Sequence, residues 1–325
     1  MRKAYVVYWM VWACALMVSG CIYLPLIPGT GNLQEVNLEG EGEAKILLVD
    51  ISGMLDTKKE SGFIEHPSLP ARIKEELELA KKDEQIQGVV LRINTPGGTV
   101  TASDILYHEI LEFKKEKKIP VVAAMMDMAT SGGYYVAMAS DYIVAHPSTI
   151  TGSIGVIMLT ANAQGLLEKI GVQPTAIVSG PKKAMGSPFQ PLKDDEREIF
   201  QNVIDTLYQR FLVVVEAGRP NLSKAPIRAL ADGRIYTADM AKGKGLIDQV
   251  GYLDEAIDWV KQKANLAEDA QVITYRRGGN GGHANIYSSM TVPTIGAVGL
   301  PPVDSGSLIR AVSGGGPQFM YMWIP

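Results

Sequence analysis

The sequence predicts an α/β protein in which helices cover a parallel β-sheet. Several strand-like segments are unbroken apolar runs, and amphipathic helical segments separate them along the chain. An unbroken apolar run is typical of a parallel strand that is buried on both faces. The chain has 325 residues, of which 46% are hydrophobic, so it is long enough to bury a sizeable core.

The expected elements alternate in order along the chain. The strand-like runs are residues 44–53, 86–96, 119–128, 142–146 and 154–160. The helical segments are residues 69–83, 101–118, 194–218, 223–232, 237–245 and 254–267. Helix-start signals agree with these boundaries, because Thr101 to Asp104 has the form of a capping box and Pro70 lies near a first helical turn. Acidic residues open the segment at 194, where they suit the helix dipole.

The first residues predict an export or anchoring segment rather than part of the fold. Arg2 and Lys3 precede an uncharged apolar run that continues to residue 28. Small residues before Cys21 resemble a bacterial lipoprotein signal, in which Cys21 would be lipidated. An uncleaved membrane helix is the alternative, since a bilayer needs roughly 20 apolar residues. In both cases the positive residues stay inside and the body of the protein faces outward.

The remaining chain divides by composition into three parts. Residues 29–43 are polar and glycine-rich and are interpreted as a linker. Residues 44–277 carry the alternating pattern and are predicted to form the catalytic domain. Residues 278–325 are rich in Gly, Pro and Ser and are interpreted as a flexible tail, whose apolar end "QFMYMWIP" is expected to pack on a neighbour.

Composition argues against several classes of function. The formal net charge is −4, and without a long basic block we expect no nucleic-acid partner. Both cysteines, Cys14 and Cys21, lie in the N-terminal segment, so the body has neither a disulfide nor a cysteine nucleophile. The four histidines lack the spacing of metal ligands, and we expect no metal site.

Ser131 stands in a distinctive setting, "MDMATSGGYYVAMASD", between an apolar run and a helical one. Such a position can present a hydroxyl at a helix N-terminus, where free backbone N–H groups collect. Gly132 and Gly133 remove the side chains that would obstruct a tight turn or an approaching substrate. The residues fit an acyl-transfer nucleophile, and they equally fit a serine that only caps the helix.

A second glycine pair, Gly97 and Gly98, ends the preceding strand in "INTPGG". The carboxyl ends of parallel strands meet at one edge of a sheet, where α/β proteins bind ligands. The N–H groups of Gly98 and Gly132 could therefore converge on one carbonyl oxygen, as in an oxyanion hole. A simple Pro-Gly turn is the alternative.

A serine nucleophile needs a general base, and lysine fits better than histidine. His146 ends an apolar run and His108 lies among charges in a helix, so neither has a catalytic setting. Lysine can act as a base when burial lowers its pKa toward neutrality. Lys182 and Lys183 lie in "VSGPKKAMGSPF", a segment with few other charges, and are the candidates.

Four segments together resemble one family. They are "LRINTPGG", "TSGGYYVAMASDYIVAHPSTITGSIGVI", "SGPKKAMGSPF" and "ADGRIYTADMAKGKGLIDQVGYLDEAI". In this order they are similar to the signal peptide peptidase A family, which are serine proteases of the caseinolytic-protease/crotonase superfamily. The resemblance covers residues 44–267 and is to the short form with a single repeat. It implies a fold of repeated ββα units with a parallel sheet and covering helices.

The resemblance also implies roles for individual residues. Ser131 would be the nucleophile and Lys183 the general base, because the family's lysine follows its Ser-Gly by two residues, which fits Lys183 better than Lys182. Ser153, in "TITGSIG", would orient the lysine amine. The N–H groups of Gly98 and Gly132 would form the oxyanion hole. No metal, nucleotide or coenzyme is implied.

The implied activity is hydrolysis of apolar peptides, chiefly remnant signal peptides, at the outer side of the cell membrane. The resemblance further implies a ring of about eight protomers in which neighbours share the serine–lysine dyad. Two alternatives remain at this point. One is a membrane scaffold of the same fold without catalysis, and the other is a crotonase-like acyl-CoA enzyme.

Overall fold

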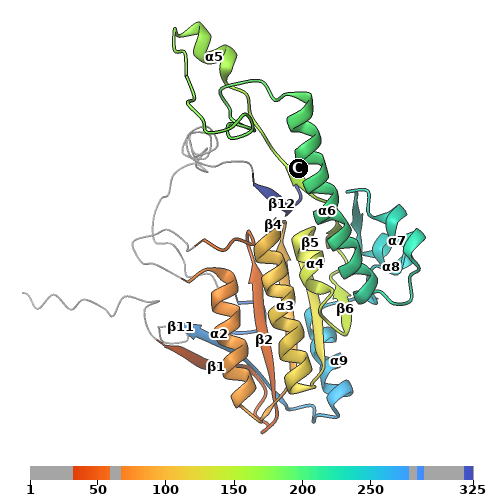
Figure 1. The fold of residues 1–325 in the computed structure, drawn as a ribbon. Coiled ribbons are helices and arrows are strands. Elements are labelled where there is room, and N and C mark those ends of the chain that lie inside the picture. Colours follow the sequence, from red (N-terminus) through yellow and green to blue (C-terminus); the bar gives the residue numbers. More distant parts are fainter. Residues whose placement is uncertain (1–31, 59–66, 278–283, 289–317, 325) are drawn as a thin grey trace, which may run out of the picture.

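The computed structural model describes residues 32–58, 67–277, 284–288 and 318–324. In these residues nine strands form one sheet, whose main path runs in the order β1-β11-β2-β3-β5-β6-β10 (Figure 1). The strands on this path are β1 (Leu33–Glu39), β11 (Gln271–Arg277), β2 (Lys45–Ser52), β3 (Ile86–Thr95), β5 (Val121–Thr130), β6 (Tyr142–Ala145) and β10 (Gln249–Val250). Two short strands, β7 (Ile150–Gly152) and β9 (Ile235–Thr237), extend it beside β5.

The centre of the sheet is parallel. Each neighbouring pair from β11 through β2, β3, β5 and β6 to β10 is parallel, whereas β1 pairs with β11 and β9 with β7 in the antiparallel sense. The predicted α/β class with a parallel sheet and covering helices is confirmed. The carboxyl ends of β3 and β5 consequently lie side by side, as the candidate site requires.

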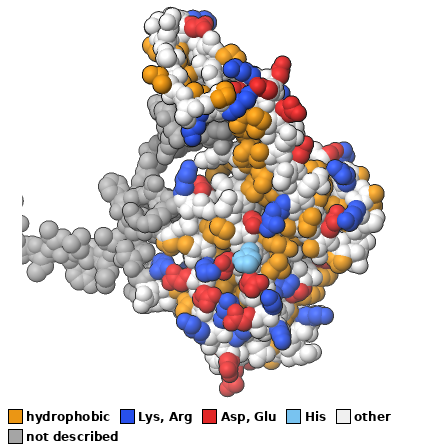
Figure 2. Space-filling model, viewed as in Figure 1, with side chains coloured by type: hydrophobic (Ala, Val, Ile, Leu, Met, Phe, Trp, Pro, Cys, Tyr) orange, Lys and Arg blue, Asp and Glu red, His pale blue; other side chains and the backbone are white. Residues whose placement is uncertain are grey.

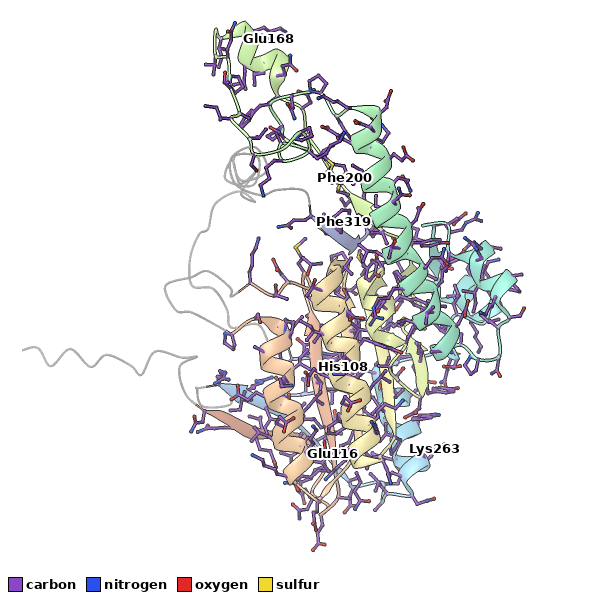
Figure 3. The ribbon with its side chains drawn as sticks, viewed as in Figure 1. His108, Glu116, Glu168, Phe200, Lys263 and Phe319 are labelled. Atoms are coloured by element: carbon purple, nitrogen blue, oxygen red, sulfur yellow. The ribbon has the colours of Figure 1, made fainter. Side chains whose placement is uncertain are left out.

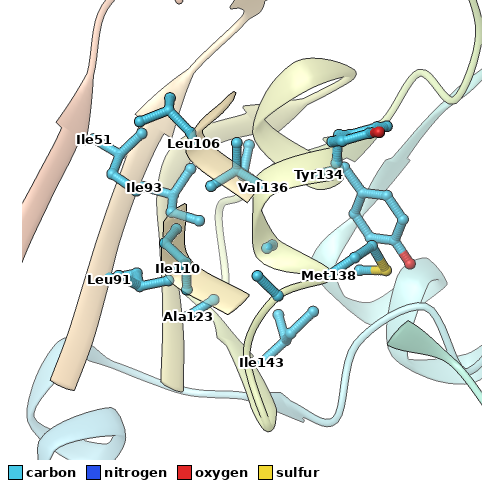
Figure 4. Packing of buried hydrophobic residues seen from close by; sticks show 14 of the residues in the cluster. Ile51, Leu91, Ile93, Leu106, Ile110, Ala123, Tyr134, Val136, Met138 and Ile143 are labelled. Atoms are coloured by element: carbon cyan, nitrogen blue, oxygen red, sulfur yellow. The ribbon is translucent and has the colours of Figure 1, made fainter. Parts of the chain in front are cut away.

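Helices cover both faces of the sheet. On one face lie α2 (Leu69–Lys82), α3 (Val100–Lys117) and the short α4 (Gly132–Ala137), and α9 (Leu253–Ala264) lies on the other. Successive residues of β2 alternate between the two cores, with Leu47 and Val49 in the first and Ile46 and Leu48 in the second. Figure 4 shows part of the first core, in which Leu106 and Val136 pack near Ile93. Each fully buried aliphatic side chain of this kind contributes roughly 1.5–3 kcal/mol.

An arm, residues 159–193, leaves the body after β8 (Ile157–Met158) and carries the short helix α5 (Gln164–Lys169) at its far end (Figure 1). Glu168 marks this end in Figure 3. The chain returns through the long helix α6 (Asp194–Gly218), followed by α7 (Lys224–Leu230) and α8 (Ala238–Gly243). Hydrophobic side chains are exposed on the arm and on α6 (Figure 2): Leu159, Leu166, Ile170, Val172, Ile177, Val178, Phe189, Ile199, Val203 and Val213.

The structure differs from the sequence-based expectation in the short strands. Residues 33–39 fall within the expected linker but form the edge strand β1, which pairs with β11. Its alternating, half-polar sequence suits an edge strand with one solvated face. Residues 150–152 form β7 between the expected strands at 142–146 and 154–160, and only residues 157–158 of the latter are extended. The N-terminal segment 1–28, with Cys21, lies outside the described residues, and no helix among the described ones has the length and hydropathy to cross a bilayer.

An ion pair between Arg72 and the buried carboxylate of Glu76 connects α2 to β2. Glu76 is 1% exposed, and its Oε1 accepts a hydrogen bond from Arg72 Nη1 at 2.6 Å. Arg72 Nη2 also donates to the backbone oxygen of Asp50 at 2.5 Å. Burial raises the pKa of Glu76 to about 7, although Arg72 opposes this shift.

Glu76 should make the stability of the fold depend on pH. Its pKa rises from an ordinary value of 4.5 to about 7 in the folded chain, so between these values the folded state binds more protons than the unfolded state. The free energy of unfolding should therefore fall as pH rises through this window, by on the order of 3 kcal/mol. Glu76→Gln keeps an acceptor for Arg72 and cannot ionise, so it should remove this decrease.

Urea unfolding at pH 5 and pH 8 measures the effect in the parent and in Glu76→Gln. Glu109→Gln is the matched control, because Glu109 forms an ion pair with Lys74 whose lysine side chain is 56% exposed. If Glu76→Gln loses as much stability as the parent between the two pH values, the assignment of the pH dependence to Glu76 is wrong.

Candidate active site

Ser131 lies in the sharp turn between β5 and α4. Its backbone has φ 52° and ψ −111°, a left-handed conformation that costs a non-glycine residue about 1–3 kcal/mol. The Ser131 N–H donates to the Gly152 carbonyl at 2.7 Å, and the Ser131 carbonyl accepts from the Tyr135 N–H at 2.9 Å. These bonds fix the serine between the end of a strand and the first turn of a helix, a strained turn of the kind that presents hydrolase nucleophiles.

The Ser131 side chain has no structural partner. The residue is 1% exposed, and its Oγ forms no hydrogen bond with any described residue. It does not cap α4, so the alternative of a serine that only caps the helix is not supported. A buried polar group without a partner is uncommon and needs an explanation such as a catalytic role.

The turn "TPGG" packs directly against the start of α4. Gly97 has φ 101°, and a Cβ built on it would lie 2.8 Å from the backbone nitrogen of Gly132. A Cβ on Gly98 would lie 1.9 Å from the Leu55 carbonyl oxygen. Leu55 in turn donates its N–H to Gly97 O at 2.9 Å and accepts from Thr99 N at 2.8 Å. Glycine is therefore required at 97 and 98 because backbone segments fill the space of a side chain.

The C-terminal strand β12 (Phe319–Met322) occupies the cleft beside this turn. It runs antiparallel between β4 (Gly97–Thr99) and β8 and places Tyr321 opposite Gly98. The sequence predicts that the terminus packs on a neighbour, and in the single chain it pairs with its own β4 instead. Phe319 lies near Phe200 of α6, with ring centroids 6.4 Å apart (Figure 3).

The carbonyl group of Tyr321 points toward the glycines. Its oxygen would lie 2.0 Å from a Cβ on Gly97 and 3.1 Å from one on Gly132. The Trp323 N–H donates to the Pro96 carbonyl at 2.9 Å. Because hydrogen-bonded and non-bonded pairs alternate in antiparallel strands, Tyr321 and Gly98 form a pair in which each N–H faces the other residue's carbonyl.

The side chain of Tyr321 fills an aromatic pocket, formed by α4 and α6. Its ring stacks on Tyr135 at 5.1 Å with an angle of 26°, and it lies 4.6 Å from the ring of Phe211. The Tyr321 hydroxyl donates to the Leu207 carbonyl at 2.8 Å, and the side chain is fully buried. The pocket thus has two aromatic walls and one polar acceptor, a combination that suits a phenol.

Beyond Tyr321 the cleft continues as an open groove of about 600 Å³. Its lining residues are Asn94, Thr95, Pro96, Asp127, Met128, Met322, Trp323 and Ile324. The cleft holds an extended strand, β12, between β4 and β8, and the residues that follow Tyr321 form part of the groove wall.

Ser153 is brought next to Ser131 by the pairing of β7 with β5. Thr130 pairs with Gly152, so the two serines follow paired residues. Ser153 also has a positive φ, 50°, is 7% exposed, and donates its N–H to the Arg234 carbonyl at 2.8 Å. The strand that produces this arrangement, β7, is not among the strands expected from the sequence.

The two candidate lysines lie on the arm, away from Ser131 in the single chain. Lys183 is exposed in a turn whose backbone bonds to Gly180, and Lys182 forms an ion pair with Asp195 at the start of α6. Neither contacts the Ser131 Oγ, which has no hydrogen-bond partner in the described chain. His108 lies on the outer surface of α3 (Figure 3), and His146 bonds to Ser148.

Two contributors to this site are not predicted from the sequence. Leu55, which braces Gly97 and Gly98, belongs to a segment without a strand-like pattern and carries no signal. Tyr321 lies in an apolar terminus that stands out in the sequence, but its pairing with a strand more than 200 positions away has no local sequence signature.

Comparison with known proteins places the chain among peptidases. The model of peptidase family S49 matches residues 113–267. A provisionally named signal peptide peptidase SppA of Enterococcus faecium is 37% identical over 76% of this chain and 72% of its own length. A provisionally named protease of Methanocaldococcus jannaschii is 33% identical over 85% of this chain and 87% of its own length.

A third relative is a longer protein, the chloroplastic serine protease SPPA of Arabidopsis thaliana. It is 37% identical over 61% of this chain, and the match covers 29% of that protein. The match to family S49 includes Ser131, Ser153 and Lys183, and two relatives above 30% identity are covered over more than two thirds of their length. The chain therefore belongs to peptidase family S49 and is a serine peptidase.

Proposed function

We propose that the protein is a membrane-associated serine endopeptidase that hydrolyses apolar peptides with Ser131 as nucleophile and Lys183 as general base. The observation that carries this proposal is the buried, unpartnered Ser131 hydroxyl beside a cleft that already holds an extended strand. Both features suit acyl transfer to a peptide bond, because the strand presents its carbonyl groups to a fixed edge of the site.

The proposed substrate lies as β12 does. Its backbone pairs with β4, and the carbonyl of the scissile bond takes the position of the Tyr321 oxygen. The N–H groups of Gly98 and Gly132 then donate to that oxygen and stabilise the negative charge that develops on it. The register of β12 and the closeness of the Tyr321 oxygen to Gly97 and Gly132 support this placement.

In the proposed reaction, Lys183 in its neutral form accepts the proton of the Ser131 hydroxyl as the oxygen attacks the carbonyl carbon. The resulting ammonium group donates that proton to the leaving amine, and an acyl-enzyme remains on Ser131. Water then attacks the ester, again with Lys183 as base, and releases the peptide acid. Ser153 is proposed to hold the lysine amine, since it follows the strand that pairs with the strand before Ser131.

Within one chain no described base reaches Ser131, so we propose that neighbouring copies complete each other's sites. Lys183 is exposed on an arm that extends away from the body (Figure 1). The exposed hydrophobic side chains of the arm and α6 suit a protein interface better than solvent. A closed ring of about eight protomers would satisfy both features, because each arm would lie on the next body.

The proposed substrates are remnant signal peptides and other apolar segments. The aromatic pocket, with walls from Tyr135 and Phe211, favours a large nonpolar side chain at the position of Tyr321. A relative that is provisionally named a signal peptide peptidase agrees with this class of substrate. The N-terminal segment, through Cys21 or as a helix, would hold the catalytic body at the outer surface of the membrane, where such peptides remain.

Co-assembly of two inactive variants tests the shared site. Ser131→Ala and Lys183→Ala should each lower kcat/KM at least about 100-fold, because each removes one half of the dyad. Co-expressed in equal amounts, they should regain about one quarter of the parent activity, since random assortment in a ring places an intact serine beside an intact lysine at one interface in four. The measurement is hydrolysis of a fluorogenic apolar peptide by the purified mixed assembly.

Lys182→Ala is the matched control for the neighbouring lysine and should keep most of the activity. A mixture that remains as inactive as its components would place both groups in one chain and refute the shared dyad. Full activity in Ser131→Ala alone would refute the nucleophile and the peptidase mechanism with it.

Removal of residues 318–325 tests whether β12 occupies the substrate cleft. An occupied cleft binds substrate only in the fraction of molecules from which the strand has left, so truncation should lower KM several-fold and leave kcat nearly unchanged. Tyr321→Ala, which empties the aromatic pocket, should reproduce part of the change. The measurement is the same peptide hydrolysis, and an unchanged KM in the truncated chain would show that β12 does not compete with substrate.

A further inference from the structure

A carboxylate on α3 connects the two walls of the aromatic pocket. Asp104 Oδ1 accepts a hydrogen bond from the Tyr135 hydroxyl at 2.6 Å. The same oxygen accepts from Arg210 Nε at 2.9 Å and from Arg210 Nη2 at 2.6 Å. Tyr135 belongs to α4 and Arg210 to α6, so one side chain ties together three helices that meet near β12 (Figure 1).

The first wall of the pocket is tied to the nucleophile. The Tyr135 N–H donates to the Ser131 carbonyl, and the Tyr135 ring stacks on Tyr321. The edge of Tyr107 contacts Tyr135 at 5.3 Å between centroids. Burial and the adjacent Asp104 raise the pKa of Tyr135 far above its ordinary value, so its hydroxyl remains a donor to Asp104.

The second wall comes from α6. Phe211, which contacts both Tyr321 and Tyr135, directly follows Arg210. Leu207, one turn earlier, supplies the carbonyl that accepts the Tyr321 hydroxyl. The bonds between Arg210 and Asp104 therefore join this face of α6 to the carboxylate that also holds the Tyr135 hydroxyl.

We propose that Asp104 is a positioning residue that makes the pocket selective for a tyrosine-like side chain on the acyl side of the scissile bond. This inference rests on the proposed function, in which the residue at the position of Tyr321 donates the acyl group. Asp104 does not touch the substrate. It fixes the ring of Tyr135 and the position of Phe211, and these two rings contact the substrate. Without Asp104 the two walls separate or rotate and lose their stacking on an aromatic side chain.

A contribution to overall stability alone does not account for this arrangement. The Arg210 side chain is 55% exposed, and exposed ion pairs add little to the stability of a fold. The short bond from a buried tyrosine to Asp104 is the part that lies inside the pocket wall. Asp104 should therefore affect what binds in the pocket more than whether the chain folds.

The first measurement compares two peptides that differ only in having Tyr or Leu at the acyl position. In the full chain, Asp104→Ala should lower the ratio of kcat/KM for the Tyr peptide to that for the Leu peptide about two- to tenfold, the range expected for losing one aromatic pairing. Competition from β12 cancels in this ratio, since it affects both peptides equally. Asp104→Asn, which keeps an oxygen acceptor for Tyr135, should retain most of the preference.

Glu109→Ala is the matched control. Glu109 lies on the same helix and forms a comparable ion pair with Lys74 on α2, remote from the pocket walls. It should leave the ratio unchanged. An equal loss for both peptides in Asp104→Ala, or a ratio as high as that of the parent, would overturn the specificity role.

A second measurement needs no catalysis. In a Ser131→Ala background, amide hydrogen exchange of residues 319–323 reports how firmly Tyr321 sits in the pocket. Asp104→Ala should accelerate this exchange about two- to tenfold, and Glu109→Ala should not. Unchanged exchange would overturn the inference. Faster exchange in a protein whose parent cleaves neither peptide would leave the role of Asp104 in the pocket standing and refute the proposed function instead.

Discussion

The hydrogen bond between the Ser131 N–H and the Gly152 carbonyl is the contact on which the geometry of the site depends. It joins the turn that follows β5 to the end of β7. It thereby holds Ser131 at a positive φ, a conformation that is unfavourable for serine without such support. The neighbouring glycines are closely packed, because a Cβ on Gly133 would lie 2.7 Å from a methyl carbon of Thr95 and one on Gly152 would lie 2.5 Å from the ring of Tyr236. The pairing of β5 with β7, and of β7 with β9, thus supports the strained serine. The hydroxyl is buried and has no hydrogen-bond partner among the described residues.

The cleft separates recognition of a backbone from recognition of a side chain. β4 consists largely of glycines packed against Leu55 and α4. An extended peptide beside it would therefore meet only main-chain groups, which do not discriminate between side chains. Selection falls to the aromatic pocket, in which Tyr135 and Phe211 come from different helices. In the proposed function, this division would let one site accept many apolar segments and still prefer particular residues at one position. It also explains why the chain's own terminus fits, since "FMYM" is extended, apolar and carries a tyrosine.

The sequence predicted the elements that local patterns determine and missed those that depend on distant partners. The runs that became β2, β3 and β5 and the long helix α6 were identified from apolar continuity and periodicity, with α6 beginning and ending at the predicted residues. β1, β7 and β12 were not identified, because short half-polar or turn-like segments become strands only when a neighbour supplies hydrogen-bond partners. The approach of "TPGG" to Ser131 followed from a topological rule, since adjacent parallel strands end at one edge. No such rule predicts the hydrogen bonds of Leu55 to β4 or those of Asp104 to Tyr135 and Arg210. Both are tertiary contacts between residues whose local sequence carries no signal.

The separation of Ser131 from the arm has a physical logic if the dyad is shared. A protease that matured as a single chain would carry a competent nucleophile and base before reaching its final location. In this chain the hydroxyl is buried in the body while Lys183 is solvated on the arm. A lysine acts as a general base only in its neutral form, which removal from water favours. Assembly would therefore supply both the position of the lysine and its removal from solvent in one step. The exposed apolar surface that is proposed to drive this association lies on the same arm, so packing and placement of the base would arise from one contact.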